Sequence, residues 1–86
     1  MFNRKKKIRE TAMKLRALIL ANVHLDSALK FYKSLESQTP DHEAEKQKFI
    51  AEVEEAQLRL KVAIFDLIGT KFYKKNLDAI VKLANI

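Results

Sequence analysis

The sequence predicts an all-α fold: an antiparallel helical hairpin with a short third helix, associating into a multi-helix bundle. Apolar residues recur at alternating steps of three and four, which is the heptad spacing of paired helices. The 86 residues include one Gly and one Pro, too few for the closely spaced turns of an all-β fold. Charged residues make up 33% and hydrophobic residues 48%, a balance typical of a globular chain of one small domain.

The first helix is expected over residues 4–35, which contain no Gly or Pro. At 1.5 Å per residue this helix is about 45–50 Å long. Asn22 falls on an a position of its heptads, where a buried Asn typically fixes helix register and partner number and lowers stability. The apolar row that carries this Asn, here called the seam of the first helix, consists of Ile8, Thr11, Leu15, Leu18, Asn22, Leu25, Leu29 and Tyr32.

A turn over residues 36–39 and a second helix over residues 40–68 follow. Thr39 is suited to the N-cap, and Pro40 fits the first helical position, where its missing N–H is not needed. Asp41 and Glu43 add negative charge to the first turn, which the helix dipole favours. The seam of this helix consists of Phe49, Val53, Ala56, Leu60, Ala63 and Leu67.

A third helix is expected over residues 71–84. Gly69 is a natural residue just after a helix C-terminus, and Thr70 can cap a following helix. The alternative is a second helix that continues through Gly69 at a cost of about 1 kcal/mol relative to Ala. The sequence leaves open whether the last segment folds back or extends the second helix. Its apolar face consists of Tyr73, Leu77, Ile80, Val81 and Ala84.

Both long helices carry more apolar surface than one antiparallel neighbour can cover. A helix that is apolar around most of its circumference is buried around most of it. A third helix of 14 residues spans only about 20 Å and cannot cover the first helix along its whole length. We therefore expect self-association, as a dimer or larger, or docking onto a larger protein partner. The predicted interface residues are Met13, Leu20, Val23 and Phe31 on the first helix and Leu58, Val62 and Phe65 on the second.

Charge is segregated along the chain, whose net charge is +6. The bend of an antiparallel hairpin brings the basic N-terminal residues to the same end as the lysines that follow residue 70, and the acidic residues 41–55 to the other end. The basic end is expected either to contact phosphate or an acidic surface or only to aid solubility. The candidate contact residues are Arg4, Lys5, Lys6, Lys7, Arg9, Lys14, Arg16, Lys71, Lys74 and Lys75.

The tetrapeptide Lys-Phe-Tyr-Lys occurs at residues 30–33 and 71–74. Aromatic rings between lysines can stack on nucleic-acid bases, but the same rings can close the ends of a helical bundle. Tyr32 lies in the seam, which favours the structural interpretation there. Phe72 is the better candidate for an exposed ring.

The sequence gives no pattern for catalysis, cofactor binding or metal binding, and we expect a protein that is not an enzyme. Cys is absent, the two His residues are 18 positions apart, and one Gly cannot build a phosphate-binding loop. The longest uncharged run, residues 17–25, is too short for a membrane span, which needs about 20 residues. A cytoplasmic location is compatible with these features.

Three functions compete on this basis. The first is a non-enzymatic interaction module that self-assembles or docks onto a larger protein through its apolar helix faces. The second is a basic accessory protein that binds RNA or DNA. The third is an immunity-type hairpin or a secretion partner, because Tyr32-Lys-Ser-Leu-Glu36 matches the Tyr-x-x-x-Asp/Glu pattern of type VII secretion partners. There the motif follows the second helix, whereas here it ends the first, and no Trp-x-Gly occurs at the turn, so we interpret the match as coincidence.

Overall fold

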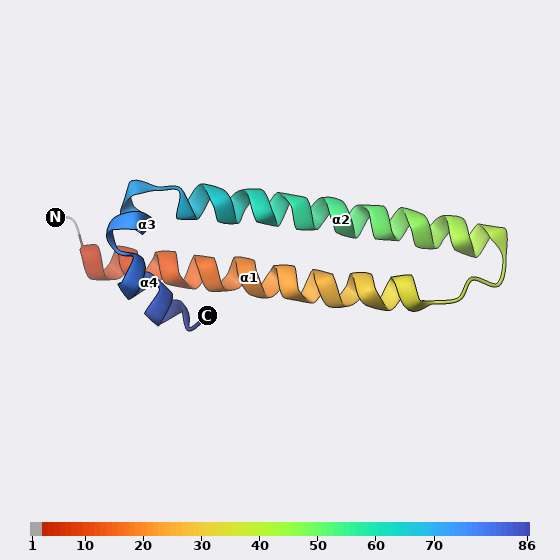
Figure 1. Ribbon diagram of the computed structural model, residues 1–86, viewed down its shortest axis with the longest axis horizontal. Helices are drawn as coiled ribbons and strands as arrows, with labels where there is room; N and C mark the ends of the chain where they lie inside the picture. The colour runs from red at the N-terminus through yellow and green to blue at the C-terminus, as the bar shows by residue number, and fades with distance from the viewer. Residues whose placement is uncertain (1–2) are drawn as a thin grey trace.

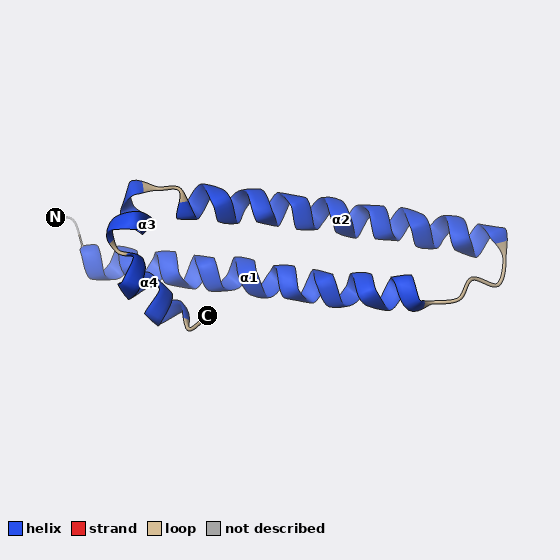
Figure 2. Cartoon of the chain, viewed as in Figure 1, coloured by secondary structure: helices blue, strands red, loops and turns tan. Residues whose placement is uncertain are grey.

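The chain folds as a long antiparallel pair of helices with two short helices at one end (Figure 1). This is a computed structural model, and it describes residues 3–86. The helices are α1 (Arg4–Ser34), α2 (Pro40–Ile68), α3 (Lys71–Lys75) and α4 (Leu77–Ala84), and residues 3–86 include no strand (Figure 2). The molecule is a rod of 61 × 19 × 18 Å. The predicted all-α hairpin is therefore confirmed.

Short-range contacts determine where α1 begins and ends. The side chain of Asn3 accepts a hydrogen bond from the backbone N–H of Lys6 at 3.0 Å, so Asn3 is the N-cap. The helix ends at Ser34, after which Leu35 has extended backbone angles (φ −70°, ψ 133°). The observed α1 agrees with the helix predicted over residues 4–35 to within one residue.

The N-terminus of α2 is built as predicted. The hydroxyl of Thr39 accepts a hydrogen bond from the backbone N–H of His42 at 3.1 Å, and Pro40 is the first helical residue. At its other end α2 stops at Ile68, which excludes a continuous helix through Gly69. Gly69 has right-handed angles (φ −79°, ψ −10°), so it does not use the left-handed conformation typical of glycine there. Termination comes instead from Thr70, whose hydroxyl donates to the Leu67 carbonyl at 2.8 Å and whose ψ is 150°.

The single third helix predicted over residues 71–84 is wrong, because Asn76 divides it into α3 and α4. Asn76 has non-helical angles (φ −120°, ψ 24°) and is only 7% exposed. Its Nδ2 donates to the Phe72 carbonyl at 2.9 Å, and its Oδ1 accepts from Arg4 Nε at 2.9 Å. These bonds satisfy both ends of a buried amide and fix the change of direction between the two short helices.

We expect Asn76→Ala to lower the free energy of unfolding by about 1–2 kcal/mol, because it leaves the Phe72 carbonyl and the Arg4 guanidinium without these hydrogen bonds. Urea unfolding followed by circular dichroism measures the change. Lys75→Ala is the control, since Lys75 is the neighbouring residue and is exposed on α3. An Asn76→Ala chain as stable as the parent would contradict this account of the junction.

The main hydrophobic core lies where α4 folds back across α1 (Figure 1). Its buried residues are Ala12, Leu15, Ile80 and Ala84. The two alanines have small side chains, which lets the helices approach closely enough for Leu15 and Ile80 to become almost fully buried. Arg16 Nη1 donates to the Ala84 carbonyl at 3.0 Å and so satisfies a backbone acceptor at the end of α4. The last segment therefore folds back, which the sequence left open.

A second, smaller cluster holds the hairpin together nearer the turn. Its buried residues are Leu29, Ile50 and Val53, and Leu25 and Tyr32 pack against it. The sequence placed Phe49 rather than Ile50 in the seam of α2. Phe49 instead remains 41% exposed, with its ring 4.2 Å from that of Tyr32 between centroids.

Asn22 lies on α1 between the residues of these two clusters, as the heptad pattern predicted. The residue is half-buried, and its Oδ1 atom is buried with no hydrogen-bond partner among the described residues. Burial without a partner is unfavourable for a side-chain amide. The seam of the hairpin is therefore weakest at its centre, between two apolar clusters.

Candidate functional site

The outer side of α1 carries an apolar row that faces away from α2. Met13 is two residues before the core residue Leu15, Leu20 is two before Asn22, and Phe31 is two after Leu29. Two residues correspond to about 200° of rotation, so this row lies on the opposite side of α1 from the seam. We call it the α1 outer stripe; its members are Met13, Ala17, Leu20, Val23 and Phe31.

The outer side of α2 carries a shorter row of the same kind. Leu58 and Val62 flank the seam residue Leu60 by two positions on either side, and Phe65 is two residues before Leu67. We call Leu58, Val62 and Phe65 the α2 outer stripe. Since each stripe faces away from the other helix, the two lie on opposite edges of the rod, and one flat contact cannot cover both.

The structure leaves all seven predicted interface residues exposed to solvent. The exposed fraction ranges from 43% for Leu20 to 65% for Phe65. In contrast, Leu15 and Ile80, the large core residues, are at most 2% exposed. Neither α3 nor α4 covers the stripes, so the surplus of apolar surface predicted from the sequence is present on the folded chain.

The basic residues gather at the end of the rod that holds the N-terminus, α3 and α4 (Figure 1). Arg4, Lys74 and Lys75 line one surface depression there, together with Asn76. Several of the predicted phosphate contacts have structural partners. Arg4 bonds to Asn76, Arg16 bonds to the Ala84 carbonyl, and Lys7 Nζ lies over the Phe72 ring. Lys6 also pairs with Glu10 at 4.0 Å. Lys6 and Lys7 are nonetheless exposed, as are the other predicted cations at this end: Lys5, Arg9, Lys14, Lys71, Lys74 and Lys75.

The aromatic rings of the two Lys-Phe-Tyr-Lys segments lie in different surroundings. Tyr32 packs in the smaller core cluster, as predicted, and Phe31 meets it edge to face at 5.5 Å between ring centroids. Phe72 is half-buried against the main core, with Lys7 Nζ 4.5 Å from its ring centroid. The prediction that Phe72 is the exposed ring is therefore wrong; the exposed ring is Phe31, on the α1 outer stripe. Phe72 packs against the core formed where the last segment folds back onto α1.

The opposite end of the rod, at the turn between α1 and α2, is acidic. Asp41 and Glu43 lie in the first turn of α2, and Glu36 lies in the turn itself. The Glu43 carboxylate accepts hydrogen bonds from the Ser37 hydroxyl and, at 2.9 Å, from Gln47 Nε2. These two bonds hold the pKa of Glu43 below its ordinary value of 4.5. Glu43 therefore keeps its negative charge to lower pH than an isolated glutamate. With basic residues at one end of the rod and these acidic residues at the other, the molecule is dipolar along its axis.

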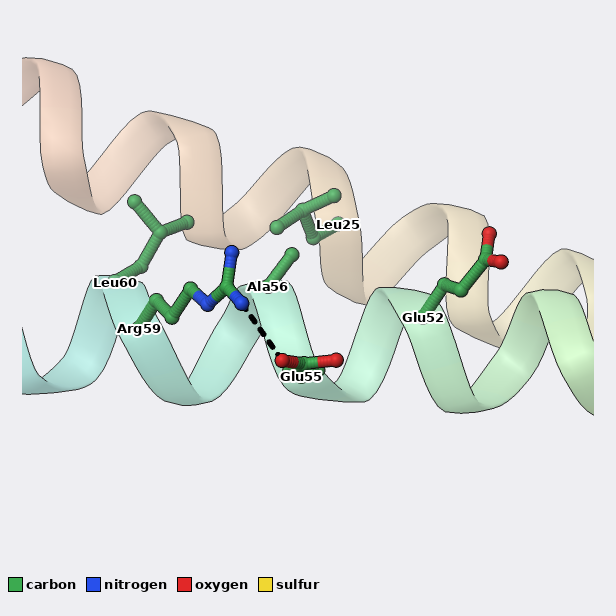
Figure 3. Close-up of a pocket in the computed structure, with 6 residues that line it drawn as sticks. All are labelled: Leu25, Glu52, Glu55, Ala56, Arg59 and Leu60. Carbon is green, nitrogen blue, oxygen red and sulfur yellow. Dashed lines mark hydrogen bonds and ion pairs between the residues drawn. The ribbon is translucent and has the colours of Figure 1, made fainter.

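A shallow groove of about 500 Å³, which the sequence did not reveal, lies between the long helices. Figure 3 shows Leu25 from α1 and Leu60 from α2 on either side of it, with Ala56 between them. Arg59 and Glu55 form an ion pair of 2.7 Å at its border. The signal for this hollow is the small Ala56 at a seam position, where a larger residue would fill the space.

Among residues 3–86, no group of three or more His, Cys, Asp or Glu side chains is placed to hold a metal ion. None of the helices in the same residues is long and apolar enough to cross a membrane. Comparison of the chain with protein-family models, curated proteins and solved structures gives no match.

Proposed function

We propose that this chain is a non-enzymatic interaction module, which self-assembles or docks onto a larger protein complex through the outer stripes of α1 and α2. The exposure of these stripes on a folded chain carries the proposal. Fully covering a Leu, Met or Phe side chain contributes about 1.5–3 kcal/mol relative to leaving it in water. Contiguous apolar rows bordered by polar residues are typical of protein interaction surfaces.

The arrangement of the stripes determines what kind of assembly they suit. Each lies along a straight helix, so the natural partner is another helix that packs lengthwise against it. Their position on opposite edges lets the rod sit between two neighbours. The cytoplasmic location expected from the sequence stays a prediction.

The basic end supports a second candidate, the binding of RNA or DNA. Eight exposed cations in a small region produce a positive field that attracts phosphate. Two observations weaken this candidate. The half-buried Phe72 offers no open ring at the basic end, and the exposed Phe31 lies near the other end of α1. The acidic turn at that far end also repels an extended duplex.

The mass of the native complex, measured before and after nuclease treatment, distinguishes the two candidates. For an interaction module we expect a mass well above 10.0 kDa that nuclease leaves unchanged. A chain with Leu20→Gln and Phe65→Gln should lose the complex, while a chain with Lys5→Gln and Lys74→Gln should keep it. Loss of mass on nuclease treatment, together with complex formation that weakens steeply with salt, would instead support nucleic-acid binding and overturn the first proposal.

A further inference from the structure

We infer that the α1 outer stripe is covered by the same stripe of a second copy of this chain, bound antiparallel. The two α1 helices would cross at the level of residue 22, on the side of α1 that faces away from α2. This rests on the proposed function and adds the occupant and its orientation. The α1 outer stripe offers a longer contact surface than the α2 outer stripe. Met13 and Phe31 are about 27 Å apart along the helix, whereas Leu58 and Phe65 are only about 10 Å apart.

Reversal of the stripe matches its two apolar ends. The level midway between Met13 and Phe31 is residue 22, so a two-fold axis there places Met13 of one copy beside Phe31 of the other. The same axis places Leu20 beside His24 of the second copy. The largest exposed ring on α1 thus meets a flexible methionine, a pairing that packs well. A contact of this kind is closed and symmetric, because each copy supplies the same surface.

Charge selects the antiparallel orientation over the parallel one. Residues 3–16 and 59–86, at one end of the rod, hold thirteen Lys and Arg against three Asp and Glu, a net charge of +10. Residues 26–55, at the other end, hold four Lys against eight Asp and Glu, a net charge of −4. The rod is 61 Å long, several times the Debye length of about 8 Å at physiological salt, so the two ends act as separate poles. Antiparallel copies place opposite poles side by side, and parallel copies place +10 beside +10.

The residues at the borders of the stripe fit the same orientation. Arg9 lies one turn before Met13 and, under the two-fold axis, falls level with Leu35 of the second copy. Glu36 is the next residue along, and both Arg9 and Glu36 are exposed. The contact thus has an apolar centre, and the cation at its border, Arg9, lies near the acidic turn of the second copy.

Disulfide trapping tests the orientation directly, because the natural chain has no Cys. We expect an equimolar mixture of Met13→Cys and Phe31→Cys chains to form a disulfide-linked dimer on mild oxidation, detected by non-reducing electrophoresis and mass spectrometry. Neither chain alone should cross-link, since identical positions are then about 27 Å apart and a disulfide needs Cα atoms within about 7 Å. The matched control is a mixture of Leu58→Cys and Phe65→Cys chains, which should remain unlinked.

Light scattering over a dilution series measures the dissociation constant of the dimer. Leu20→Glu should raise the dimer dissociation constant at least ~100-fold, because the two-fold axis buries the added charge twice. Val62→Glu, on the α2 outer stripe, should change it less than ~3-fold. Circular dichroism must show that both variants keep the parent helix content, as expected for substitutions at exposed positions.

Several outcomes would overturn the inference. They are cross-linking of the Met13→Cys chain with itself, cross-linking through Leu58→Cys and Phe65→Cys, a larger effect of Val62→Glu than of Leu20→Glu, and a parent chain that never dimerises. All four leave the proposed interaction module intact, because that proposal also includes docking of the apolar faces onto a larger protein. The nuclease experiment described above tests that proposal separately.

Discussion

Leu15→Ala is expected to lower the free energy of unfolding by about 3 kcal/mol, the largest single effect predicted for this chain. Leu15 is 2% exposed and is the only large residue of α1 in the buried set of the main core. Shortening it removes apolar contact with Ile80 and leaves a cavity between α1 and α4. Stabilities of single domains are typically about 5–15 kcal/mol, so the loss is a large fraction of the total.

Urea unfolding of the parent and the variant, at a concentration where both have the same assembly state, measures the change. Leu83→Ala is the matched control, because it removes the same atoms from α4 at a residue that is 55% exposed. That control should stay within about 0.5 kcal/mol of the parent. Equal losses from the two substitutions would mean that α4 does not pack on α1 as described. Amide exchange in α4 should also rise selectively in Leu15→Ala, since this core fixes α4 in place.

Asn22→Leu is expected to act in the opposite direction and raise the free energy of unfolding by about 1–2 kcal/mol. The buried Oδ1 of Asn22 has no hydrogen-bond partner among residues 3–86, and Leu removes that unsatisfied acceptor. Leu also joins the two core clusters on α1 into one continuous apolar seam. The gain in stability is expected to loosen the preference for a single assembly state, because a polar residue at an a position penalises alternative pairings.

Melting temperature and solution mass should be measured together for this variant. Asn22→Asp serves as the control of similar shape: it buries a charge in the same position and should destabilise the hairpin. If Asn22→Leu left both melting temperature and assembly state unchanged, Asn22 would have no role in the seam.

The sequence was sufficient to predict those features of the structure that depend on neighbouring residues. Thr39 and Thr70 cap helices through backbone N–H groups three residues further along the chain, so local pattern identifies them. The heptad spacing likewise placed Asn22 and Tyr32 on the inner side of α1. The same spacing identified the outer stripes, because surplus apolar residues can be counted without knowing the fold.

The sequence was insufficient to predict those features of the structure that depend on residues far apart in the chain. The break at Asn76 involves a hydrogen bond from the side chain of Arg4, 72 positions away, whereas residues 71–84 by themselves have a continuous helical pattern. Phe72 packs against the core and lies beside Lys7, a contact between residues 65 positions apart. Ile50 rather than Phe49 is buried because the position of α2 around its own axis is set by packing against α1, and heptad spacing leaves that choice open.

The mass of the purified chain, followed by light scattering over a wide dilution series, tests the central claim most directly. That claim is that a single folded copy leaves the outer stripes of α1 and α2 exposed and that association with a second copy covers at least one of them. We predict a mass of at least twice 10.0 kDa at high concentration, which falls to 10.0 kDa on dilution while the helix content stays unchanged. A chain that remains at 10.0 kDa at every concentration would contradict it.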